Sequence, residues 1–146
     1  MGKKQRLIEL FNSALEDEHQ AFVQYLSHAE LVSGKDSEPI VERLKEIAND
    51  EKGHQEKFRE MIGMYLGGVP SMKISKTYEA KTLDEILKTN LKNEMEAVDK
   101  YMSIMEELSG AKDELKYVYM RLEHNLRHII MDEQEHIAEL KQLLGQ

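Results

Sequence analysis

Two Glu-x-x-His pairs lie in stretches of the sequence where apolar residues recur at helical spacing. Residues three positions apart share one helix face, so each pair directs a carboxylate and an imidazole to the same point. The helix-forming segment before each pair carries one further Glu among its apolar positions. Carboxylates and imidazoles in this combination are ligands for a metal ion of mixed oxygen and nitrogen preference. The candidate ligands are Glu18, Glu51, His54, Glu94, Glu133 and His136.

Four carboxylates directed into a helical core require a counter-charge, because a buried charge without a partner costs several kcal/mol. No Lys or Arg occupies the apolar stripes at that level. Two Fe(II) ions would balance the four negative charges, and the imidazoles add none. We therefore predict two iron ions within about 4 Å of each other. Iron or manganese suits these ligands better than zinc, although manganese or zinc can occupy the site as isolated.

A non-catalytic arrangement is the alternative to the metal site. The same residues could form a hydrogen-bonded polar layer in a helical bundle or interaction module. Six ligand-type groups arranged as a repeated pair favour the metal. A third pair, Glu16 and His19, lies off the apolar stripe, and we interpret it as a solvated surface pair.

Four segments with apolar spacings of three and four predict the helices that position these side chains. Ser37-Glu38-Pro39 is a typical start for the second helix. Thr82, with Glu85 three residues on, is a typical N-cap for the third. Gly residues follow the end of each segment. The apolar stripes span residues 7–32, 40–65, 83–108 and 115–143.

The connections predict the topology. Short links after the first and third helices favour two antiparallel hairpins, and residues 67–82 are long enough to cross the bundle between them. Glu18-x-x-Ala21-x-x-x-Tyr25 and Glu94-x-x-Ala97-x-x-x-Tyr101 repeat in the two halves. The sequence thus predicts an all-α four-helix bundle, in one domain over residues 1–146, with a pseudo-two-fold axis.

Composition excludes several classes of protein. The chain has 146 residues, a net charge of −8 and no cysteine. The absence of cysteine removes disulfides, Cys-ligated zinc, iron–sulfur clusters and thiol catalysis. Without a basic stripe we expect no nucleic-acid partner. Without an apolar run of 18 residues or a signal sequence we expect no membrane span and a cytoplasmic location.

One Glu from each of two helices and a Glu-x-x-His from each of two others resemble the ferritin-like di-iron carboxylate superfamily. Within it, Gln24-Tyr25, His28-Ala29 and Leu66-Gly67-Gly68-Val69-Pro70 are most similar to bacterioferritin. The resemblance implies that Glu18 and Glu94 are terminal ligands, that Glu51 and Glu133 bridge the irons, and that His54 and His136 bind one iron each.

Neighbouring residues are expected to orient these ligands. We predict that Asp50 and Asp132 accept the free ring N–H of His136 and His54, respectively, which fixes the tautomer. Tyr25 and Tyr101 are expected either to bond to a ligand carboxylate or to act as ordinary core aromatics.

Departures from the resembled families refine the expected activity. Lys52 stands where bacterioferritin has its haem-binding Met, so we expect no haem. The segment after the fourth helix lacks a short fifth helix, which weakens the case for a 24-subunit shell, and we expect a homo-oligomer, a dimer or larger. Rubrerythrins typically carry an extra Glu where this chain has Ala97, together with a Cys-rich domain. We therefore expect a ferroxidase that reacts with Fe(II) and O2 or H2O2, with iron handling and oxidative-stress protection as its role. The alternative is a rubrerythrin-like peroxidase that uses an external electron donor.

Overall fold

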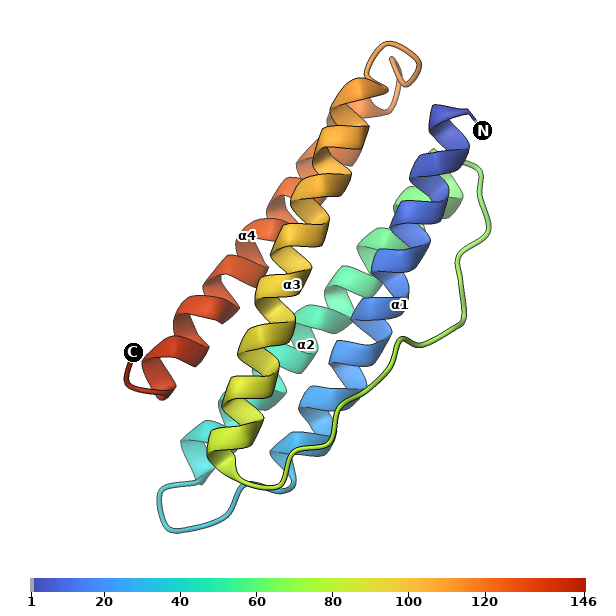
Figure 1. Ribbon diagram of the computed structural model, residues 1–146. Helices are drawn as coiled ribbons and strands as arrows, with labels where there is room; N and C mark the ends of the chain where they lie inside the picture. The colour runs from blue at the N-terminus through green and yellow to red at the C-terminus, as the bar shows by residue number, and fades with distance from the viewer. Residues whose placement is uncertain (1) are drawn as a thin grey trace.

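The computed structural model describes residues 2–146, and within them the chain forms a bundle of long helices without strands. Two antiparallel hairpins pack side by side, as Figure 1 shows. This confirms the predicted four-helix architecture. The helices are α1 (Lys3–Ala29), α2 (Glu38–Glu60), α3 (Leu83–Gly110) and α4 (Tyr119–Leu143), and the π-helix η1 (Met61–Tyr65) extends α2.

The predicted N-cap of α3 and the predicted glycine turn after α2 are both present. Thr82 Oγ1 accepts a hydrogen bond from the Glu85 backbone N–H at 3.2 Å, and the Glu85 carboxylate accepts one from the Lys81 N–H. After η1 the chain turns at Gly67, where φ is +69°, a conformation that favours glycine. Each cap satisfies backbone groups that a helix end leaves free.

Two predicted boundaries were wrong. The first helix ends at Ala29 rather than after Val32, and Leu31 is more than half exposed, so further helix would bury little. The fourth helix begins at Tyr119, although its stripe was expected to start at Leu115. Leu115 is nevertheless buried in the core, from a run of turns that follows α3. The apolar spacing around Leu115 therefore predicted correctly that this residue is buried, but it predicted wrongly that the residue lies in a helix.

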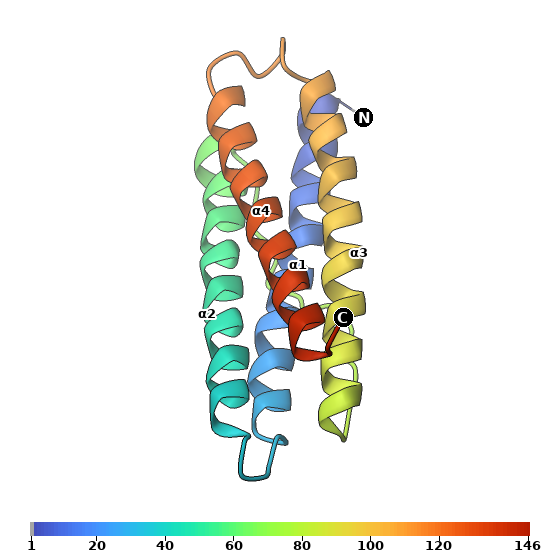
Figure 2. The ribbon, with the colours of Figure 1, turned by 90° about the vertical axis from the view of Figure 1, so that its left-hand side faces the viewer.

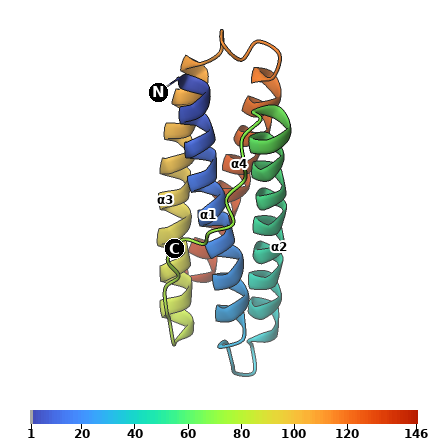
Figure 3. The same cartoon turned by 90° about the vertical axis from the view of Figure 1, so that its right-hand side faces the viewer.

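The crossover, residues 66–82, runs along α1 from the end of α2 to the start of α3, as Figure 3 shows. Polar contacts hold it to α1. Ser71 Oγ donates to Glu16 Oε2 at 2.6 Å, and His19 Nδ1 lies 2.6 Å from the Lys73 carbonyl oxygen. Glu16 and His19 therefore fasten the crossover, and the interpretation of them as merely solvated was wrong.

The hydrophobic core consists of two clusters, one toward each end of the bundle. One contains Phe11, Phe58 and Leu122, and the other contains Ile47 and Leu140. Along every helix the candidate ligands fall between residues of the first cluster and residues of the second. No helix in the described part of the chain is long and apolar enough to cross a membrane.

Candidate metal centre

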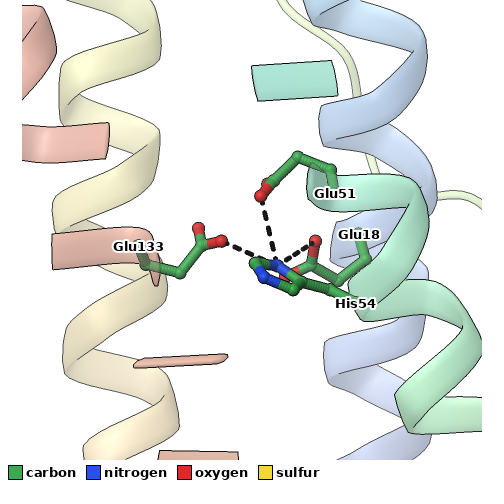
Figure 4. A group of neighbouring side chains, drawn as sticks. All are labelled: Glu18, Glu51, His54 and Glu133. Atoms are coloured by element: carbon green, nitrogen blue, oxygen red, sulfur yellow. Dashed lines mark ion pairs between the residues drawn. The ribbon is translucent and has the colours of Figure 1, made fainter. Parts of the chain in front are cut away.

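All six candidate ligands are buried between the two apolar clusters. Each is at most 4% exposed. Their oxygen and nitrogen atoms form two overlapping groups, within each of which the atoms lie within 4.8 Å of one another. One group is Glu18, Glu51, His54 and Glu133, drawn in Figure 4; the other is Glu51, Glu94, Glu133 and His136.

The overlap of the groups distinguishes their members. Glu51 and Glu133 belong to both groups, whereas Glu18 and His54 belong only to the first. In the first group, His54 Nδ1 lies 2.9 Å from Glu133 Oε1 and 3.2 Å from Glu51 Oε1. The arrangement has the pseudo-two-fold symmetry that the sequence repeat indicated, with the two shared carboxylates between two otherwise separate sets.

In the second group the ring of His136 takes the place of His54. Its Nδ1 lies 3.5 Å from both Glu51 Oε1 and Glu94 Oε1. The two imidazole rings have their centroids 6.3 Å apart. One imidazole therefore serves each group.

Carboxylates of the opposite hairpin fix both rings. His54 Nε2 lies 2.9 Å from Asp132 Oδ2, and His136 Nε2 lies 2.9 Å from Asp50 Oδ2. With Nε2–H donating to the Asp, the neutral ring keeps its Nδ1 lone pair directed at the centre. The predicted hydrogen bonds of Asp50 and Asp132 are thus present.

Two buried tyrosines hold the carboxylates that belong to one group each. Tyr101 donates its hydroxyl to Glu18 Oε1 at 2.6 Å, and Tyr25 donates to Glu94 Oε1 at 2.7 Å. Both bonds cross between α1 and α3. Of the two roles expected for these tyrosines, they therefore have the hydrogen-bonding one, and each leaves the second carboxylate oxygen free.

Buried side-chain atoms without a hydrogen-bond partner show whether a metal ion fits this layer. Every one of the six residues has a buried atom without a hydrogen-bond partner. Buried polar atoms are nearly always paired, so a concentration of six in one layer is unusual for a merely structural arrangement. All six are carboxylate oxygens or imidazole nitrogens, the atoms that ligate iron, manganese or zinc. They are Glu18 Oε2, Glu51 Oε1, His54 Nδ1, Glu94 Oε2, Glu133 Oε1 and His136 Nδ1.

The pKa values reflect the same crowding. Burial, and next the charge of Glu51, raise the pKa of Glu18 to about 8. Burial opposes ionisation of Glu51 too, but its contacts with His54 and Glu133 outweigh this and lower its pKa to about 2. Burial lowers the pKa of His136, yet the facing Glu94 carboxylate outweighs it and raises the pKa to about 9. Without metal, the cluster thus retains protons at neutral pH.

A cavity of about 430 Å³ reaches the centre from the side of α1 and α3. Glu18 and Glu94 line its inner part, and Lys76 and Lys100 line it closer to the surface. Ala97, the position where rubrerythrins typically carry a further Glu, also lines this cavity. Small molecules therefore have a route to the carboxylates.

A closed ring of hydrogen bonds beside this cavity was not anticipated. Gln24 Nε2 donates to Asn90 Oδ1, Asn90 Nδ2 donates to His28 Nδ1, and His28 Nε2 donates to the Tyr78 carbonyl. The Tyr78 N–H closes the ring by donating to Gln24 Oε1. The ring ties the crossover to α1 and α3. Its signal in the sequence was the spacing of Gln24 and His28, four residues apart on one helix face, and of Asn90, four residues before Glu94.

A four-helix bundle with a buried layer of four Glu and two His in two overlapping groups defines the class of ferritin-like di-iron carboxylate folds. The family model for the ferritin-like domain matches residues 8–146, so the chain belongs to the ferritin-like domain family. No curated protein matches the chain in sequence.

Solved structures agree with this assignment. A ferritin-like di-iron carboxylate protein of Bacillus anthracis strain Ames is 27% identical, with a TM-score of 0.90 and 99% of each chain covered. The bacterioferritin of Rhodobacter capsulatus is 23% identical, with a TM-score of 0.83 over 97% of this chain and 84% of that one. A dodecameric thioferritin of Bacteroides fragilis is 24% identical, with a TM-score of 0.83 over 97% and 86%. The last two are similar in fold, and the predicted superfamily is confirmed.

Proposed function

We propose that the protein binds two iron ions at the six-ligand centre and oxidises Fe(II) with O2 or H2O2. The observation that carries the proposal is the set of six unpartnered buried atoms. Glu51 and Glu133, which belong to both groups, would bridge the two ions. Glu18 and His54 would complete one site, and the remaining ligands would complete the other.

The bound pair of iron ions would supply two electrons to O2 or H2O2. The protein residues provide orientation and charge. Tyr25 and Tyr101 hold one oxygen of Glu94 and Glu18, and the other oxygen of each carboxylate has no hydrogen-bond partner and is free for a metal ion. Asp50 and Asp132 keep each imidazole in the tautomer that ligates through Nδ1. The apolar clusters above and below exclude bulk water from the layer.

Ferroxidase activity is preferred over peroxidase activity for two reasons. The chain has no Cys or Trp that would relay electrons from a partner. Position 97 in the cavity wall, where rubrerythrins typically carry a further Glu, is occupied by Ala97. Electrons would then come from further Fe(II) as substrate, with iron handling and oxidative protection as the outcome.

The test is stopped-flow mixing of Fe(II)-loaded protein with O2 and, separately, with H2O2, followed by the absorbance of the ferric product. We expect O2 to oxidise excess Fe(II) over several turnovers, and Glu94→Ala to abolish this. Glu106→Ala, which removes an exposed carboxylate from the same helix, is the matched control and should react like the wild type. Oxidation by H2O2 hundreds of times faster than by O2, with turnover on an added reductant, would instead establish the peroxidase.

We also propose that the protein is a homo-oligomer. Exposed apolar side chains on α1, in the turn after it and on the crossover are available for contacts between copies; examples are Leu26, Leu31 and Met72. The related thioferritin of Bacteroides fragilis is dodecameric. Light scattering during size-exclusion chromatography would measure the number of subunits, and a purely monomeric protein would contradict the proposal.

A further inference from the structure

Two histidines on α4 have no place in the centre described above. His124 and His128 are four residues apart, face solvent, and have ring centroids 4.3 Å apart. The other histidines of the chain each bond to a protein atom. Zn–N bonds are about 2.0–2.1 Å long, so two imidazoles this close can each present one nitrogen to a single ion after small rotations.

The pair lines a pocket of about 490 Å³ between α2 and α4, on the face that Figure 2 turns to the viewer. Asp132, one further turn along α4, lines the same pocket, and its Oδ2 accepts from His54. Its other oxygen is left for another contact. Carboxylate and imidazoles four residues apart share one helix face.

Asn125 provides a second, independent indication that this pocket holds a ligand. It lines the pocket, is only 5% exposed, and its Nδ2 has no hydrogen-bond partner. A buried amide normally has one. A water molecule completing the coordination of a metal beside His124 and His128 would be such a partner.

The charges around the pocket indicate which ions it would select. Asp50 and Asp132 line it, but so do Lys57 and Arg121, so the lining has no net charge when the imidazoles are neutral. Affinity must therefore come from the ring nitrogens. This favours Zn(II), Ni(II) or Cu(II) over Mg(II) and Ca(II), which prefer oxygen ligands.

The protonation of His124 is compatible with such ions. Partial desolvation, and next the adjacent ring of His128, lower the pKa of His124. Its neutral form, the form that binds metals, therefore predominates at pH 7.

We propose that His124 and His128 bind one transition-metal ion, with Asp132 as a third ligand, at a solvent-facing site beside the buried centre, whose His54 lines the same pocket. The positions 82 residues earlier, related by the sequence repeat, are Glu42 and Glu46. The second half of the chain thus has imidazoles where the first half has carboxylates, and the first half supplies matched control positions.

The test compares the wild type with the double variant His124→Ala/His128→Ala, using Zn(II) equilibrium dialysis and elemental analysis. The wild type should bind one more Zn(II) per chain than the double variant. Cu(II) added after the first two equivalents of Zn(II) should give an electron paramagnetic resonance spectrum with coupling to two imidazole nitrogens, and the variant should lose it. Circular dichroism should be unchanged, because both side chains are exposed.

The double variant Glu42→Ala/Glu46→Ala should bind as many ions as the wild type. Equal zinc stoichiometry in the wild type and the histidine variant would overturn the proposal. So would loss of the extra ion in the glutamate variant, or its displacement by millimolar Mg(II). The result is independent of the buried centre, because a failure of that centre to bind metal would lower both proteins equally and leave their difference at one ion.

Discussion

Glu51→Ala should remove most of the stabilisation that metal gives this protein, because Glu51 belongs to both ligand groups. Glu18 belongs to only one of them, so Glu18→Ala should leave the other group complete. Both residues are 1% exposed, and neither forms part of the apolar clusters. The two variants therefore differ chiefly in how many metal sites each one damages.

The size of the stabilisation follows from the coupling between metal binding and folding. An ion that binds only the folded state stabilises it by about 2.7 kcal/mol when its concentration is 100 times Kd. For a chain of this size, 1 kcal/mol shifts the melting temperature by about 2–4 °C. Each site should therefore contribute about 5–11 °C, and both together about 10–22 °C. Glu51→Ala should lose nearly all of this increment, and Glu18→Ala about half.

Differential scanning calorimetry of metal-free and metal-loaded protein measures the increment, with elemental analysis of the same samples. Glu56→Ala is the control, since Glu56 lies on α2 near Glu51 but is exposed. A wild-type increment in Glu51→Ala would refute the assignment of metal to this layer. Equal losses in Glu51→Ala and Glu18→Ala would refute the distinction between shared and unshared carboxylates.

Three further predictions concern the ligands and the fold. Burial raises the pKa of Glu18 to about 8 in the folded protein, above the unfolded value of 4.5, so the metal-free protein should lose stability as pH rises from about 4.5 to about 8. Metal binding should release the proton of Glu18, and metal affinity should increase over the same pH range. Calorimetry of metal binding in two buffers would measure the proton release. Tyr101→Phe removes the hydroxyl that positions Glu18, and a competition titration should show metal affinity about 10–100-fold weaker, whereas unchanged affinity would make the tyrosine a core aromatic only. Thr82→Ala should lower the free energy of unfolding by about 1 kcal/mol, because the N-cap of α3 is lost. Gly68→Ala should lower it by about 1–3 kcal/mol, because the new Cβ would lie 2.8 Å from Ile8 Cγ2. Urea denaturation measures both changes, and midpoints equal to the wild type would contradict these assignments.

The sequence predicted which side chains meet in the core better than it predicted the helix ends, because periodicity fixes the direction of the candidate ligands. Glu51 and His54 share a face with Ile47 and Phe58, so their direction follows once the segment is helical. Spacing alone could not decide whether Leu115 reaches the core from a helix or from turns, since both bury it. A boundary depends on local backbone bonds that a periodic pattern does not specify.

Contacts between distant segments were the other part that the sequence could not supply. Nothing local to Glu16 or His19 indicates that the crossover returns to them, because their partners are more than 50 residues away. The ring formed by Gln24, Asn90 and His28 has the same origin. Repetition of the two halves was the exception, because a two-fold relation predicts that Asp50 meets the His of the other hairpin.

Every hydrogen bond that orients a ligand crosses from one hairpin to the other: Tyr25 to Glu94, Tyr101 to Glu18, and each Asp to the opposite imidazole. Neither hairpin alone can therefore hold its carboxylates or imidazoles in the required orientation, although most other helix contacts lie within a hairpin. A transient separation of the two hairpins is thus the motion that would release a bound metal ion, and a bound metal ion would oppose that separation. Amide hydrogens facing the seam between the hairpins should consequently exchange more slowly once metal is bound, while those near the exposed tip of each hairpin keep their rates.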